Sequence, residues 1–132
     1  NHAEMMAMRD RLRAKGVPVV GRVDHGMGCS MYFAGPENLS LEFSYSNEPI
    51  NAEAWIDREV VQLAGINAEE LARFKQPEGF ADQGGEVAQP NVAEAPGPHM
   101  TNYPEGAYAA IMGTPDEVMY DSLESNPPVT AA

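Results

Sequence analysis

Two short runs of alternating apolar and polar residues, joined by a turn, constrain the fold of this chain most. The runs cover residues 29–33 and 39–45, and Gly, Pro, Glu and Asn occupy residues 35–38. Proline presets one turn dihedral and asparagine tolerates the left-handed region, so residues 35–38 favour a tight turn. Alternation with a period of two is typical of half-buried strands. The sequence therefore predicts an antiparallel hairpin.

The strand period sorts the side chains of this hairpin onto two faces. One face is apolar and carries Met31, Phe33, Leu39, Leu41, Phe43 and Tyr45. The other face carries serine hydroxyls, Tyr32 and a single acid, Glu42. Taken from the residues alone, this polar face is either plain solvent-facing surface or the wall of a site.

A helix and a further strand are expected before the hairpin. Apolar residues recur at helical spacing within residues 4–15, at Met5, Met8 and Leu12. The charged residues of this stretch are expected mostly on the opposite face, namely Arg9, Asp10, Arg13 and Lys15. A short strand is predicted over residues 17–23. The order helix, strand, strand, strand predicts an α+β fold in which the helix packs on the apolar face of an antiparallel sheet.

The composition limits the classes of partner. The 132 residues include 8 Lys and Arg against 20 Asp and Glu, which gives a formal charge of −12. Binding to nucleic acid or to an anionic membrane surface needs clustered cations, so neither is expected. The single cysteine, Cys29, excludes an internal disulfide framework and is expected to be a buried thiol. A cytoplasmic location is the expectation for such a chain.

Short helices with clear start signals are predicted in the rest of the chain. Asp57 can cap a helix that runs to Leu63. Asn67 and Glu70 form a capping box at the start of another helix. A second capping box, at residues 114–117, starts a helix that is predicted to lie near residues 115–123.

These helices are too short to be stable alone, so they need a surface to lie on. We expect residues 1–46 to form the helix-and-sheet module and residues 47–76 to be short helices packed on it. Residues 77–132 are rich in Gly and Pro over their first part, and they are expected to form a long C-terminal arm. That arm is predicted to wrap its own domain or a neighbouring subunit.

Five short motifs follow one another between Leu12 and Phe43. They are an L-x-x-x-G helix end at 12–16, His25-Gly26, Tyr32-Phe33, the turn at 35–38, and Leu41-Glu42-Phe43. Their order and spacing resemble the C-terminal half-module of the vicinal oxygen chelate superfamily. That superfamily includes glyoxalase I, the bleomycin-resistance proteins and the extradiol ring-cleaving dioxygenases.

The resemblance implies a fold and a set of site residues. The fold is a partial βαβββ-type module with a concave sheet that lacks its first strand. Glu42 corresponds to the family's metal ligand, and His25 and Tyr32 correspond to catalytic residues that line the substrate pocket. The implied cofactor is a divalent metal, with Fe(II) first and Mn, Zn or Ni as alternatives.

The histidine count limits how much of such a site this chain can build. Non-haem iron oxygenases hold the metal with two histidines and one carboxylate. The chain has three histidines, His2, His25 and His99, and neither His2 nor His99 is assigned a ligand role. The missing ligands are therefore expected from an upstream segment or from a partner chain.

The implied function is that of a subunit or fragment of a metal-dependent enzyme. It is most like an extradiol-type dioxygenase that acts on a small aromatic diol, and a glyoxalase-type lyase or isomerase would use the same fold. Two other classes stay open: a non-catalytic ligand-binding protein like the bleomycin-resistance group, and a structural assembly subunit. An open sheet edge and a small core both favour a homo-oligomer or pairing with a second module.

Overall fold

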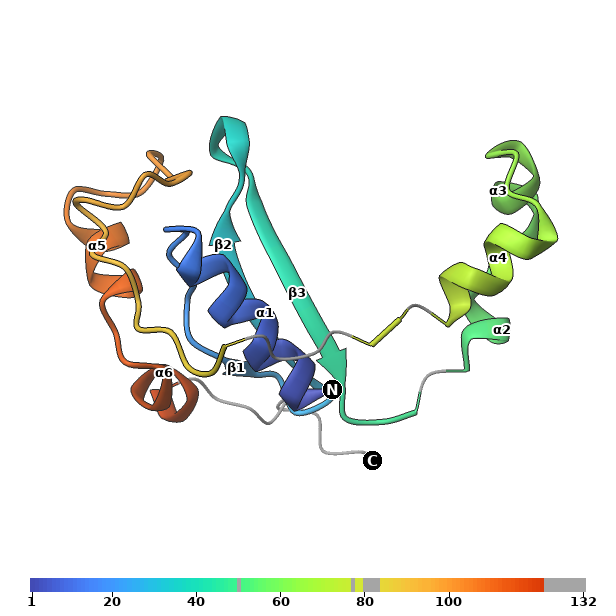
Figure 1. Ribbon diagram of the computed structural model, residues 1–132, viewed down its shortest axis with the longest axis horizontal. Coiled ribbons are helices and arrows are strands. Elements are labelled where there is room, and N and C mark those ends of the chain that lie inside the picture. Colours follow the sequence, from blue (N-terminus) through green and yellow to red (C-terminus); the bar gives the residue numbers. More distant parts are fainter. Residues whose placement is uncertain (50, 77, 80–83, 123–132) are drawn as a thin grey trace, which may run out of the picture. The chain divides into compact units, whose positions relative to one another are not determined.

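The computed structural model describes residues 1–49, 51–76, 78–79 and 84–122. It divides into two compact units, one formed by Asn1–Glu48 with Ala81–Ala132 and the other by Pro49–Phe80. The first unit contains helix α1 (His2–Ala14), three strands, and helices α5 (Ala107–Met112) and α6 (Asp116–Ser122) (Figure 1). This is the α+β arrangement that the sequence predicts at the level of fold class.

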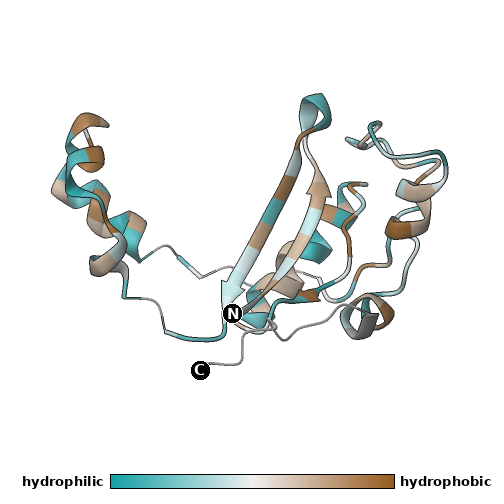
Figure 2. Ribbon diagram, turned by 180° about the vertical axis from the view of Figure 1, so that it is seen from behind, coloured by the Kyte–Doolittle hydropathy of each residue, from teal (hydrophilic) through white to brown (hydrophobic). Residues whose placement is uncertain are grey.

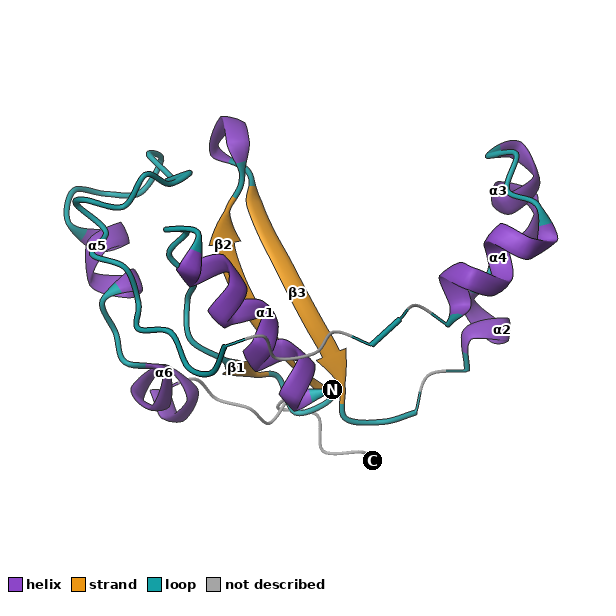
Figure 3. Cartoon of the chain, viewed as in Figure 1, coloured by secondary structure: helices purple, strands orange, loops and turns teal. Residues whose placement is uncertain are grey.

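The predicted hairpin is confirmed. Strands β1 (Val23–Asp24), β2 (Gly28–Ala34) and β3 (Ser40–Ser46) form an antiparallel sheet in the order β1-β2-β3 (Figure 3). A short 3-10 turn over Pro36–Asn38 joins β2 to β3. Glu37 and Asn38 adopt positive φ there, at 58° and 62°, which makes the chain reverse tightly.

Helix α1 packs on the apolar face of this sheet. Its first turn is closed by a capping box, in which Asn1 accepts the Glu4 amide hydrogen and the Glu4 carboxylate accepts from the Asn1 amino group. The buried core consists of Met5, Val19, Cys29 and Met31. Partly buried residues surround it, namely Met6, Leu12, Phe33, Phe43 and Tyr45. Alternating hydrophobic and hydrophilic bands follow β3, as the strand period requires (Figure 2).

The prediction of a strand over residues 17–23 is wrong for most of that range. Val19 makes a single isolated bridge to Phe33, and regular pairing begins only at Val23. Val19 instead pairs both of its backbone groups with the Gln89 side chain, which accepts from Val19 N over 3.0 Å and donates to Val19 O over 2.7 Å. Gly21 lies against helix α6, since a Cβ built there would come within 2.8 Å of Asp116 Cα. Contacts from the C-terminal segment thus replace the strand ladder.

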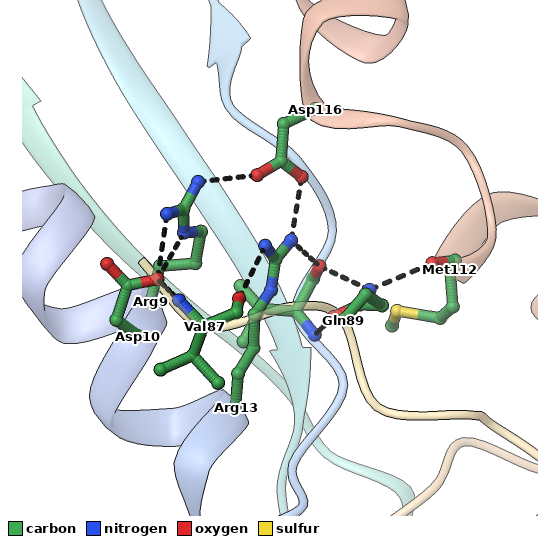
Figure 4. Close-up of polar contacts among 8 residues, drawn as sticks. Arg9, Asp10, Arg13, Val87, Gln89, Met112 and Asp116 are labelled. Atoms are coloured by element: carbon green, nitrogen blue, oxygen red, sulfur yellow. Dashed lines mark hydrogen bonds and ion pairs between the residues drawn. The ribbon is translucent and has the colours of Figure 1, made fainter. Parts of the chain in front are cut away.

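Three of the charged residues that the sequence places away from the apolar face of α1 are buried. Arg9, Asp10 and Arg13 are only 4, 7 and 7 % exposed. Arg9 Nη1 and Arg13 Nη2 each donate to one oxygen of Asp116 over 2.7 Å, and Arg9 also donates to Asp10 Oδ1 (Figure 4). Burial lowers the pKa of Arg9, but the hydrogen bonds to both carboxylates outweigh it and hold that pKa above its ordinary value.

The segment that precedes α5 runs alongside α1 and is held by polar contacts. The Val87 amide donates to Asp10 Oδ1 over 3.0 Å, and Arg13 Nη1 donates to Val87 O over 3.4 Å. Gln89 Nε2 donates to Met112 O over 2.8 Å as well as to Val19 O (Figure 4). The C-terminal residues described by the structure therefore pack on their own domain.

The second unit consists of three short helices: α2 (Ala52–Trp55), α3 (Arg58–Leu63) and α4 (Ala68–Lys75). Asp57 caps α3, and the predicted capping box of Asn67 and Glu70 starts α4. Its large apolar side chains are well exposed, with Trp55 82 % and Leu63 80 % accessible. The packing of residues 47–76 on residues 1–46 stays a prediction. Within the described residues, no helix has the length and apolar character needed to cross a membrane.

Candidate functional site

Three side chains form a continuous chain of contacts on the polar face of the sheet. His25 Nε2 lies 3.2 Å from Tyr32 Oη, and Tyr32 Oη donates to Glu42 Oε1 over 3.3 Å. A tyrosine hydroxyl has one hydrogen, which here goes to Glu42. The contact between His25 and Tyr32 therefore requires that His25 carries its proton on Nε2 and donates it.

The strand register brings Tyr32 and Glu42 together. The two residues are direct cross-strand partners in the β2–β3 pairing, so their side chains point to the same face. His25 comes from the loop between β1 and β2, and its amide donates to Gly28 O over 2.8 Å. The imidazole meets the Tyr32 ring edge-on, with ring centroids 6.5 Å apart. All three residues to which the resemblance assigns roles thus share one surface.

This surface is open in the described part of the chain. His25 and Glu42 are exposed, and Tyr32 is half-buried between them. Among the described residues, the structure gives Glu42 Oε2 no hydrogen-bond partner. Glu42 therefore keeps free lone pairs that could bind a cation from the solvent side.

Two residues that the sequence did not single out hold the loop that carries His25. Asp24 Oδ1 accepts the Gly26 amide hydrogen over 2.8 Å, and Asp24 Oδ2 accepts from Tyr120 Oη over 3.0 Å. The Gly26 amide first, and then the Tyr120 hydroxyl, lower the pKa of Asp24. The same hydrogen bond raises the pKa of Tyr120, and the Arg22 guanidinium lies 4.0 Å from the centre of the Tyr120 ring.

Only one of these two anchoring residues could have been predicted from the sequence. Asp24 begins an Asp-x-Gly turn, which is a local signal for a side chain that bonds its own backbone. Tyr120 carries no such signal, because it reaches Asp24 only when α6 folds against β1. On the other side of the loop, Asn47 Nδ2 donates to Gly26 O over 3.0 Å and the Asn47 amide donates to Met27 O over 2.9 Å.

The other two histidines have partners elsewhere. His2 lies at the start of α1, where its ring approaches Tyr45 and its Nδ1 lies 3.4 Å from Arg22 Nη1. His99 Nε2 contacts Ala95 O over 2.7 Å, and its ring packs against Tyr108. Within the residues that the structure describes, no three His, Cys, Asp or Glu side chains are grouped so that they could hold a metal.

The donor types at the site fit a divalent metal, although the set is partial. Glu42 offers a carboxylate, which is the anionic donor of the two-His-one-carboxylate arrangement. The His25 imidazole contacts Tyr32 Oη, and this contact suits a pocket role better than a ligand role. A complete site of this kind would need further ligands from another segment or another chain.

A cavity of about 390 Å³ lies away from this surface, between α1 and the segments around residues 86–89 and 112–117. Its charged lining residues include Arg9, Arg13 and Asp116, which already pair with one another. It contains none of the three residues His25, Tyr32 and Glu42. The cavity therefore belongs to the junction between α1 and the C-terminal segment.

Comparisons with known proteins add no relatives to this picture. No protein-family model matches the chain, and no curated protein or solved structure matches it.

Proposed function

We propose that this chain is a subunit or fragment of a metal-dependent vicinal oxygen chelate enzyme, most like an extradiol-type dioxygenase that cleaves a small aromatic diol. The observation that carries the proposal is the contact chain from His25 through Tyr32 to Glu42. The resemblance assigns a ligand role to Glu42 and pocket roles to the other two. The geometry supports these roles because it brings the three side chains together on the polar face.

Each residue has a distinct role in this proposal. Glu42 would bind the divalent metal, Fe(II) first, through its exposed carboxylate. When bound, such a metal supplies the chelation of the diol and its reaction with O₂. Tyr32 orients Glu42 by donating to Oε1, and among the described residues Oε2 has no partner, so it would be the oxygen that binds the metal. His25 would serve as the pocket residue that moves protons, through Nδ1, because its Nε2 donates to Tyr32 Oη.

The proposal is tested by metal binding to the purified chain under anaerobic conditions. We expect calorimetry with Fe(II) to detect a site whose affinity falls at least tenfold in Glu42→Gln, because the neutral amide is a weaker metal ligand. Glu48→Gln is the matched control, since Glu48 is an exposed acid just beyond the end of β3. Oxygen uptake with catechol is the second readout.

Two outcomes would count against the metal-dependent function. Equal Fe(II) affinity in Glu42→Gln and the parent chain would remove Glu42 as a ligand. Binding of an aromatic diol to the metal-free chain, unchanged in Glu42→Gln, would instead favour the non-catalytic ligand-binding class.

A further inference from the structure

The outer edge of β3 is a second feature of the same sheet, and it has no role in the site described above. Among the described residues, β3 pairs only with β2, so its other side has no neighbouring strand. The strand reads SLEFSYS over residues 40–46, contains neither Pro nor Lys, and carries one charged residue, Glu42. Natural proteins usually protect edge strands with such residues or cover them. This edge is therefore a template on which another strand can pair.

The printed hydrogen bonds show which backbone groups point outward. The Asn47 amide donates to Met27 O over 2.9 Å, and the Gly35 amide donates to Leu39 O over 2.7 Å. Hydrogen-bonded positions alternate along an antiparallel ladder, so the odd-numbered residues of β3 face β2. The outward N–H and C=O groups are those of Ser40, Glu42, Ser44 and Ser46.

We infer that a second copy of this chain pairs with β3 in antiparallel fashion, around a two-fold axis at Phe43. In this register Glu42 faces Ser44 of the second copy, and Ser40 faces Ser46 of the second copy. All four are outward-facing positions, so every outward amide finds a carbonyl. An axis at Glu42 would instead place two carboxylates directly opposite each other, which is destabilising. Phe43 would meet its own copy as a close aromatic pair.

This pairing extends the site to the second copy. In the continuous sheet the polar faces of both copies lie on the same side, because the paired positions share a face. The two Glu42 residues become diagonal neighbours at roughly 7–8 Å. The second copy thus supplies another carboxylate and another His25 to one surface. The consequence for metal binding rests on the proposed function, whereas the strand pairing itself does not.

Sedimentation equilibrium and hydrogen exchange test the pairing on the full chain without added metal. We expect a dimer in which the outward amides of Glu42 and Ser44 exchange slowly, and exchange faster on dilution. Ser44→Pro removes two intersubunit hydrogen bonds per dimer, so it should weaken dimerisation at least about tenfold. Ser44→Thr keeps the amide and should still dimerise. Ser40→Pro, at the first strand position where proline is tolerated, provides an independent disrupting variant.

A monomer at all concentrations would overturn the inference. A dimer whose outward amides of Glu42 and Ser44 exchange freely would also overturn it, because another surface would then join the copies. Fe(II) gives a separate readout: it should tighten the dimer of the parent chain, and this effect should vanish in Glu42→Gln. If the parent chain dimerises through β3 but Fe(II) has no effect on the dimer, the pairing stands and the proposed metal function fails.

Discussion

Tyr32 stands directly opposite Glu42 in the β2–β3 register and donates its hydroxyl hydrogen to Glu42 Oε1 over 3.3 Å. Under the proposed function, this contact joins a residue of the substrate pocket to the metal ligand. Because both side chains come from neighbouring strands of one hairpin, the arrangement depends on local pairing and needs no distant contact.

Tyr32→Phe should reduce the activity of the site without destabilising the fold. The substitution removes the hydrogen bonds to His25 and Glu42 but keeps the ring on the same strand face. Under the proposed function, oxygen uptake with catechol should fall about 10²–10⁴-fold. The free energy of unfolding in urea should change by about 1 kcal/mol or less. Ser44→Ala on the same face is the control, and equal turnover in Tyr32→Phe and the parent chain would contradict the role.

Asp116→Asn should destabilise the chain strongly, because it leaves Arg9 and Arg13 buried with less compensating charge. Removing one partner of a buried ion pair costs about 3 kcal/mol at the lower end of the usual range. The lower end applies because the Asp116 side chain is 22 % exposed. Urea unfolding measures the effect. Glu117→Gln, at the next residue and exposed, should change the stability by about 0.5 kcal/mol or less.

Gly21→Ala tests the close approach between the chain and α6. The added Cβ would lie 2.8 Å from Asp116 Cα and 3.1 Å from Met119 Cβ, so backbone has to move. We expect a loss of about 1–3 kcal/mol in the free energy of unfolding. Gly84→Ala is the matched control, since a Cβ there meets nothing within 4 Å. Equal stability of the two variants would show that α6 does not pack closely against Gly21.

The hydrogen bond between Tyr120 and Asp24 predicts that the stability of the chain depends on pH. The pKa of Asp24 is lowered from 3.8 in the folded chain, so its contribution is present above 3.8 and is lost as the pH falls through the folded value. The pKa of Tyr120 is raised from 10.0, so its contribution is present below 10.0 and is lost as the pH rises through the folded value.

Tyr120→Phe should therefore lower the melting temperature at neutral pH, and the difference from the parent chain should shrink at both extremes. Thermal melts across the pH range, followed by circular dichroism, measure this. Tyr103→Phe is the control, because Tyr103 contacts Tyr108 through its ring. A melting difference that is independent of pH would mean that the hydrogen bond to Asp24 does not stabilise the loop.

Local rules predicted the elements whose causes lie within a few residues. The hairpin, its turn and the shared face of Tyr32 and Glu42 all follow from strand alternation. The start of α4 follows from the capping box of Asn67 and Glu70. Helix α5 was not predicted, because it begins after Gly106 without a side-chain cap and so lacks a sequence signal.

Long-range contacts explain one prediction that was wrong and one feature that the sequence did not predict. Gln89 pairs with Val19 from far along the chain, so the expected strand before β1 is mostly absent. Asp116 of α6 pairs with Arg9 and Arg13 and accounts for their burial, which the pattern of α1 alone does not predict. A charge pattern on one helix cannot reveal a counter-charge that arrives from another element.

The sequence by itself determined which side chains share a face, because the period of a strand is a property of the local backbone. It therefore determined that Tyr32 and Glu42 would lie together. Only the tertiary structure decided that His25 reaches Tyr32, and there Tyr120 of α6 holds Asp24, the residue before His25. The tertiary structure also decided that charged residues of α1 are buried. Burying an ion costs free energy unless folding places an oppositely charged partner beside it.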